Sequence, residues 1–146
     1  MRKNNRSSLG NGITSDKQLD KWCHDNVPGY AGAIDRTEFS RLYKSMGAGQ
    51  SAIINLDPHY STGGTHWVAI RISSEAPVAY YKDSFGGPPP QDIVDSINDR
   101  GLIYGNRIYQ DLDEDNCGRR AAHFLRDMAR ASALGREIEY FESTEK

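Results

Sequence analysis

The stretch Thr65-His66-Trp67-Val68-Ala69-Ile70-Arg71-Ile72 decides the fold, because its side chains follow the period of two that is typical of a β-strand. The even-numbered side chains, His66 among them, would share one face, and the odd-numbered side chains, Trp67 among them, would share the other. His66 stands at the head of this strand, directly after a loop that contains Gly63-Gly64. We therefore expect the imidazole to project at the edge of a sheet rather than inside it.

Three further strands are predicted on either side of this stretch. They cover Ser51–Leu56, Val78–Asp83 and Tyr104–Gln110. The linker Asp57–Gly64 contains a proline and a pair of glycines and should form a loop. The segment Phe85–Pro90 has two glycines and three prolines, which predict an irregular, stiff connection.

Four segments have apolar residues at helical spacing. They are Asp16–His24, the region from Asp35 to Gly47, Gln91–Asp99, and the region from Cys117 to Gly135. Ser15 is the expected N-cap of the first, and Asp35 with Glu38 resembles a capping box for the second. The order of elements predicts an α+β or mixed α/β fold. We expect a polar, mobile arm over residues 1–12 and a single domain over residues 13–146.

The composition is that of an ordinary folded domain, with 37% hydrophobic and 26% charged residues. A net charge of −2 argues against a dedicated nucleic-acid-binding protein. No apolar run approaches the ~20 residues that span a bilayer, and none follows the basic start Met1–Arg6, so we expect neither a membrane partner nor a secretory signal. Two cysteines are too few for a disulfide framework and lack zinc-site spacing, which favours a reducing, intracellular setting without a metal or other cofactor.

Cys117-Gly118 opens the last predicted helix. A cysteine in this place lies at the positive end of the helix dipole beside unpaired backbone N–H groups, and both features favour the thiolate. Gly118 lets the backbone approach a ligand without an intervening Cβ. The alternative interpretation of Cys117 is a small buried apolar residue, as most lone cysteines are. Position alone leaves both interpretations open.

Three polar residues at the ends of predicted strands complete a candidate catalytic set with Cys117. If Thr65–Ile72 and Val78–Asp83 are antiparallel neighbours, His66 and Asp83 lie at the same sheet edge, where the acid can hold the imidazole. Gln110 precedes Cys117 by seven residues and can donate its amide to a developing oxyanion. Each residue also has an ordinary structural interpretation, but the ordered set indicates nucleophilic catalysis by cysteine.

The stretches Ser61–Ile70, Asp83–Gly86 and Gln110–Gly118 resemble the adenain family, the adenovirus-type maturation cysteine proteases. More broadly they are similar to the superfamily that includes the deSUMOylating ubiquitin-like-protein proteases. That superfamily has His, an acid, Gln and Cys in this order, with Trp after the His and Gly after the Cys. The interval of 17 residues from His66 to Asp83 resembles that of the adenain branch.

The resemblance implies a papain-like, adenain-like α+β fold with a central mixed sheet flanked by helices and the nucleophile at a helix N-terminus. It also implies a narrow cleft that favours glycine near the cleaved bond. The implied residues are the catalytic His66, Asp83, Gln110 and Cys117 and the substrate-binding Gly64 and Trp67.

The expected function is that of a viral cysteine endopeptidase that processes capsid or core precursors, as a monomer, in the virion and in the cytoplasm or nucleus of the infected cell. The resemblance also implies an activating peptide or DNA as a partner, although Cys23 lies in a different region from the cysteine that links the family's peptide. DNA contacts would come from five arginines, for which the alternative is a solvated helix face: Arg119, Arg120, Arg126, Arg130 and Arg136.

Three other functions stay open at this point. An isopeptidase that removes ubiquitin-like modifiers would use the same catalytic set. An acyltransferase would use the same cysteine, and a catalytically silent binding module would keep only the fold.

Overall fold

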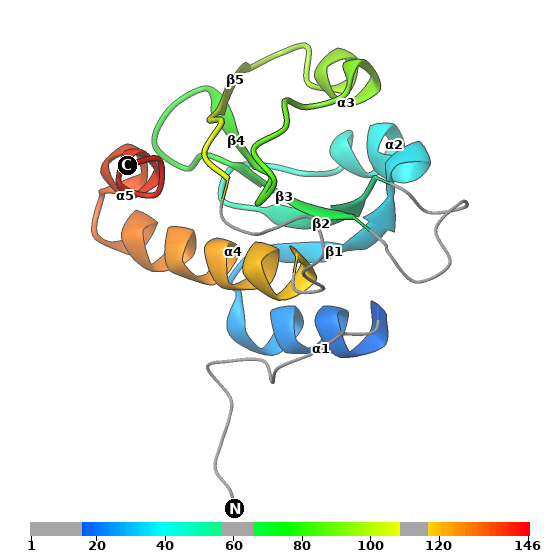
Figure 1. The fold of residues 1–146 in the computed structure, drawn as a ribbon, viewed down its shortest axis with the longest axis horizontal. Helices are drawn as coiled ribbons and strands as arrows, with labels where there is room; N and C mark the ends of the chain where they lie inside the picture. Colours follow the sequence, from blue (N-terminus) through cyan, green and yellow to red (C-terminus); the bar gives the residue numbers. More distant parts are fainter. Residues whose placement is uncertain (1–15, 57–65, 109–116) are drawn as a thin grey trace, which may run out of the picture.

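A five-stranded mixed sheet forms the centre of the protein (Figure 1). The computed structural model describes residues 16–56, 66–108 and 117–146. The strands lie side by side in chain order, as β1 (Tyr30–Asp35), β2 (Ser51–Asn55), β3 (Trp67–Ile72), β4 (Val78–Lys82) and β5 (Gly101–Tyr104). The helices are α1 (Asp16–Asn26), the 3₁₀ turn η1 (Arg36–Glu38), α2 (Phe39–Tyr43), α3 (Gln91–Ser96), α4 (Cys117–Ala133) and α5 (Glu137–Ser143).

The strand directions follow from the connections between them. The central pairs β2–β3 and β3–β4 are antiparallel, whereas the outer pairs β1–β2 and β4–β5 are parallel. Parallel neighbours need a crossover connection, and the segments that contain α2 and α3 supply the two crossovers. The expected α+β class with a central mixed sheet is therefore confirmed.

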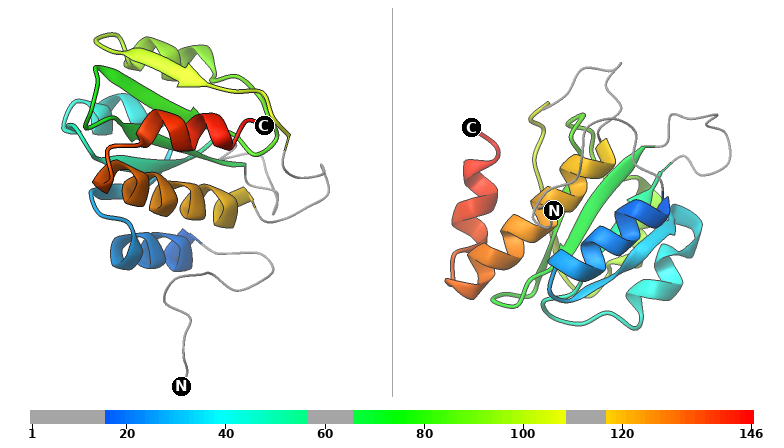
Figure 2. Two further views of the ribbon diagram at one scale, coloured as in Figure 1. Left: turned by 90° about the vertical axis from the view of Figure 1, so that its left-hand side faces the viewer. Right: turned by 90° about the horizontal axis from the view of Figure 1, so that it is seen from below.

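Each face of the sheet is covered by its own group of helices (Figure 2). On one face Trp67 and Ala69 of β3 pack in a cluster with α1, α4 and α5. On the other face Val68, Ile70 and Ile72 pack in a cluster with α2 and α3. The alternation in the sequence of β3 thus corresponds to two separate hydrophobic cores. No helix in the described ranges is long and apolar enough to cross a bilayer.

Several predicted elements differ from the observed ones. β1 was not predicted from the sequence, and the last strand lies at Gly101–Tyr104 rather than at Tyr104–Gln110. Asp35 makes no side-chain capping bond, so the predicted capping box is wrong, and α2 ends at Tyr43. α5 was also missed. The predicted arm over residues 1–12 and the predicted cap Ser15 lie outside the described residues.

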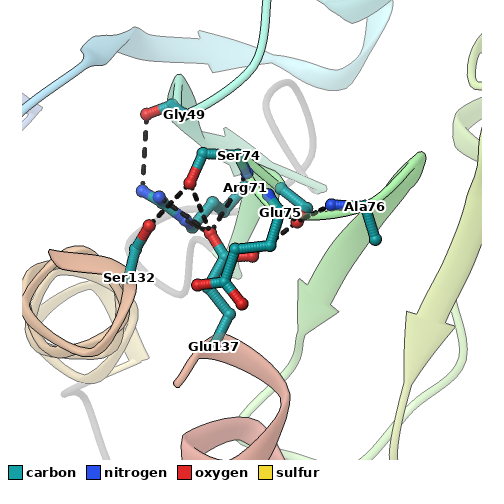
Figure 3. A network of polar contacts seen from close by, with 8 residues as sticks. Gly49, Arg71, Ser74, Glu75, Ala76, Ser132 and Glu137 are labelled. Carbon is teal, nitrogen blue, oxygen red and sulfur yellow. Dashed lines mark hydrogen bonds and ion pairs between the residues drawn. The ribbon is translucent and has the colours of Figure 1, made fainter. Parts of the chain in front are cut away.

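A buried ion pair joins β3 to the start of α5. Glu137 is fully buried and accepts hydrogen bonds from the Arg71 guanidinium at 3.0 and 3.2 Å (Figure 3). The hydroxyl groups of Ser73 and Ser74 and the backbone N–H of Ser74 also donate to this carboxylate. Burial alone would raise the pKa of Glu137, but the bonds from Ser73, Ser74 and Arg71 outweigh burial and hold that pKa below its usual value.

The variant Glu137→Gln should be strongly destabilised, because it leaves the buried Arg71 without its countercharge. We expect a loss of about 3–5 kcal/mol in the free energy of unfolding, measured by urea denaturation at pH 7. The control Glu139→Gln changes an exposed residue of the same helix and should have little effect.

This destabilisation should depend on pH. Since the pKa of Glu137 is lowered from 4.5 in the folded state, its contribution is present above about pH 4.5 and is lost as the pH falls through the folded value. A difference between wild type and Glu137→Gln that stays constant down to pH 2 would contradict this assignment.

Candidate active site

His66 and Asp83 meet at one end of the sheet, where β3 begins and β4 ends. His66 directly precedes β3 and Asp83 directly follows β4, and the antiparallel pairing places these two strand ends side by side. The imidazole Nε2 lies 3.0 Å from Asp83 Oδ1. The side chains are 17% and 6% exposed, so water screens the pair only weakly.

A tight turn after β4 holds the Asp83 carboxylate in place. The backbone N–H of Phe85 donates to Asp83 Oδ1 at 2.8 Å, and the Phe85 ring stacks on the His66 ring with 4.7 Å between centroids. Gly86 has a φ of +77°, which glycine adopts without strain. A Cβ on Gly87 would lie 2.9 Å from Asp83 Oδ2. The turn therefore fixes both the acid and one face of the imidazole.

Cys117, from a later part of the chain, lies at the same end of the sheet. It is the first residue of α4 and is 6% exposed, and its Sγ accepts a hydrogen bond from the backbone N–H of Trp67 at 3.4 Å. The close approach of α4 to β3 requires the next residue to be small, because a Cβ on Gly118 would lie 3.1 Å from Trp67 Cδ1. The sulfur thus lies beside the residue that follows His66.

The charges around His66 favour its protonated form. Burial alone would lower the pKa of His66, but the Asp83 carboxylate and the nearby Cys117 sulfur outweigh burial and raise the pKa to about 9. Nδ1 is buried and has no hydrogen bond of normal geometry to any other described residue. Because Asp83 holds Nε2, Nδ1 is the ring nitrogen that remains for proton exchange with the sulfur.

The structure brings together three of the six site residues expected from the sequence, and it places a fourth beside them. His66, Asp83 and Cys117 form the cluster described above, and Trp67 lies against it. Gly64 and Gln110 lie outside the described residues, so their expected roles in substrate binding and in oxyanion stabilisation stay predictions.

A pocket of about 220 Å³ adjoins Cys117 along one side of α4. Trp67, Ala121 and Phe124 supply apolar walls, and Lys82 and Asp127 are among its charged residues. Trp67 therefore borders an open space next to the sulfur, and its expected role in substrate binding stays a prediction.

Sequence reasoning missed two residues of this site. No sequence motif assigns a role to Phe85, although an aromatic residue two positions after an acidic strand end can reach a ring at the next strand. The predicted strand Val78–Asp83 singles out no role for Lys82, yet its side chain is only 7% exposed. The available signal was the position of this lysine, directly before the candidate acid in a predicted strand.

The arrangement is suited to nucleophilic chemistry by a thiol. A thiol at a helix N-terminus, beside an imidazole that a carboxylate holds, can attack a carbonyl carbon and pass its proton to a leaving group. Within the described ranges no group of three His, Cys, Asp or Glu residues could hold a metal ion.

Comparisons with known proteins show the fold. No protein-family model and no curated protein matches the chain. Among solved structures, the ASFV pS273R protease matches with a TM-score of 0.59 and 16% sequence identity, covering 92% of this chain and 62% of that protease. Its selenomethionine form matches with a TM-score of 0.39 and 18% identity, over 62% of this chain and 40% of that one. The chain therefore shares the fold of the pS273R protease and spans less than two thirds of its length.

The raised pKa of His66 predicts an imidazolium that persists to alkaline pH. An NMR titration of the His66 ring should give a midpoint near 9 in the wild type. The midpoint should be lower in Asp83→Asn, because burial lowers the pKa of His66 and the carboxylate that raises it is then absent. The raised pKa also stabilises the folded state below about pH 6.5, and this contribution disappears as the pH rises through 9. Equal midpoints in the two proteins would show that Asp83 does not hold the ring.

The two cysteines should differ in reactivity toward iodoacetamide. Cys23 is fully buried, and burial together with the nearby Asp20 raises its pKa to about 12, so little thiolate forms at neutral pH. Cys117 lies at a helix N-terminus beside a pocket and should react at least tenfold faster at pH 7. Peptide mapping by mass spectrometry measures both rates, and similar rates would count against an activated thiol.

Proposed function

We propose that this protein is a cysteine endopeptidase that cleaves viral capsid or core precursor polyproteins at glycine-containing sites. The observation that carries the proposal is the position of the Cys117 sulfur, 3.4 Å from the backbone nitrogen of Trp67 and beside the paired His66 and Asp83. These groups come from three separate elements of the fold and meet at one point, where a nucleophile, a proton carrier and an orienting acid are all present.

The proposed reaction follows from the geometry. The Cys117 thiolate attacks the scissile carbonyl carbon and forms a C–S bond, while the imidazolium of His66 gives its proton to the leaving amine as the C–N bond breaks. The resulting thioester is hydrolysed when neutral His66 takes a proton from water and the hydroxide attacks the carbonyl carbon, so that the C–S bond breaks and the Cys117 thiolate leaves. Asp83 holds the ring in the productive orientation throughout.

Stabilisation of the tetrahedral oxygen is assigned to Gln110 and to the backbone N–H of Cys117. Removal of one such donor typically lowers the rate by 10²–10³-fold. The assignment of Gln110 rests on its place in the sequence, seven residues before the nucleophile.

A protease is favoured over the other candidates because the chain shares its fold with the ASFV pS273R protease. The preference for viral precursors over ubiquitin-like modifiers, and the setting in virions and infected cells, come from the resemblance of the Gly-Gly-Thr-His-Trp stretch to adenain. Activation by DNA would involve the arginines of α4, of which Arg126 already pairs with Asp127 and lies over the Trp22 ring.

Replacement of the nucleophile should abolish cleavage. We expect Cys117→Ala and Cys117→Ser to give no product from a candidate structural precursor, as measured by mass spectrometry after incubation with each protein. The variant His66→Ala should lower turnover more than Asp83→Asn, because the first removes the proton carrier and the second only its orienting group. Cys23→Ser is the matched control and should keep most of the activity.

A second assay, with fluorogenic modifier and peptide substrates, separates the alternatives. Release of fluorophore from a ubiquitin-like modifier, with no cleavage of a glycine-containing viral-type peptide, would replace the endopeptidase by an isopeptidase. Cleavage of the precursor by Cys117→Ala at the wild-type rate would contradict the proposed mechanism.

A further inference from the structure

The Glu145 carboxylate, which follows α5, bridges two segments that are distant in the sequence. Its Oε1 accepts hydrogen bonds from the backbone N–H groups of Asn106 at 3.0 Å and Arg107 at 3.1 Å. Its Oε2 accepts a hydrogen bond from the Lys82 ammonium. The approach is so close that a Cβ on Gly105 would collide with this carboxylate. Glu145 thus occupies a fitted site between the end of β4 and the loop after β5.

The bridged segments lie on either side of the turn that carries Asp83. Lys82 is the residue directly before Asp83 in the chain. After the turn, Gly86 packs on the loop that follows β5, because a Cβ on Gly86 would lie 2.6 Å from the carbonyl oxygen of Asn106. The carboxylate of Glu145 therefore holds both the residue that enters the turn and the loop against which the turn rests.

The Lys82 side chain makes this bridge difficult to replace. Its Nζ lies 5.2 Å from the centroid of the Phe141 ring and 5.9 Å from that of Phe124, and it donates to Thr144 Oγ1 at 2.8 Å. Removal of one member of an ion pair with so little exposure is costly, so Glu145 contributes to holding Lys82 in place. Without Glu145, Lys82 would lose this carboxylate partner, and the end of β4 would lose its tie to the loop after β5.

We propose that Glu145 is a positioning residue for Asp83: by holding Lys82 and the backbone of Asn106, it fixes the turn from which Asp83 orients His66. The catalytic consequence rests on the proposed function, whereas the structural consequence for His66 does not.

The first experiment measures the His66 titration by NMR in Glu145→Gln and Glu145→Ala, with Glu142→Gln as the control on an exposed residue of α5. If Glu145 positions Asp83, both variants lower the His66 midpoint from about 9 by at least one unit, and the control leaves it unchanged. A wild-type midpoint in the Glu145→Ala variant, when that protein is folded, overturns the proposal.

A second variant separates positioning from general loss of stability. In Lys82→Met/Glu145→Gln no buried ammonium remains, and the glutamine oxygen can still accept the two backbone N–H groups. We expect this double variant to restore the wild-type His66 midpoint that Glu145→Gln alone loses. Restoration of thermal stability without restoration of the midpoint would show a merely structural role and would overturn the proposal.

Steady-state kinetics then connect the bridge to catalysis. We expect kcat of Glu145→Gln to fall by about tenfold with KM changed less than twofold, because Asp83 acts on the proton carrier and not on substrate binding. If the wild type cleaves no peptide, the proposed function fails, and the NMR titration still decides the role of Glu145.

Discussion

In the pairing of β3 with β4, Ala69 lies opposite Lys82, so the residue before β3 and the residue after β4 meet at the same end of the sheet. The contact of 3.0 Å between His66 and Asp83 depends on this register. A shift of one residue would turn every side chain of β3 to the opposite face. Since each face of β3 packs in its own hydrophobic core, the cores hold the register and the register holds the pair of His66 and Asp83.

Ion pairs with little exposure lie at both ends of the same two strands. At one end Arg71 pairs with the fully buried Glu137, and at the other Lys82 pairs with Glu145 next to Asp83. Such pairs add little net stability compared with apolar side chains of similar volume, but the loss of one partner is costly. They therefore act mainly to fix the places of α5 and of the residues after it. The C-terminal part of the described chain is thereby tied to the sheet that carries the site.

The sequence alone was enough to predict the elements whose apolar residues repeat at a regular spacing. β3 and α4 have clear periods of two and of about 3.6, and both were predicted close to their observed bounds. β1 was missed because Tyr30-Ala31-Gly32-Ala33-Ile34-Asp35 is rich in small residues, so its place depends on parallel pairing with β2 rather than on its own pattern.

The site could be anticipated in part for a similar reason. His66, Asp83 and Cys117 stand at element ends, which a sequence can indicate. The contact between Phe85 and His66 depends on the shape of a turn, and the bridge from Lys82 to Glu145 spans 63 residues, so neither leaves a local signal. Gln110 and Gly64 are supported by sequence alone.

The packing of Gly118 on Trp67 affects how the contact between the Cys117 sulfur and the His66 imidazole is lost. The contact of Gly118 with Trp67 and the hydrogen bond from the Trp67 N–H to Cys117 Sγ bring the first turn of α4 against the strand that follows the imidazole. A local opening that lifts this turn separates sulfur from imidazole while the five strands stay paired. Local openings of this kind have lower free energies than global unfolding. Thiol–imidazole contact is therefore expected to fail at a milder stress than the sheet does.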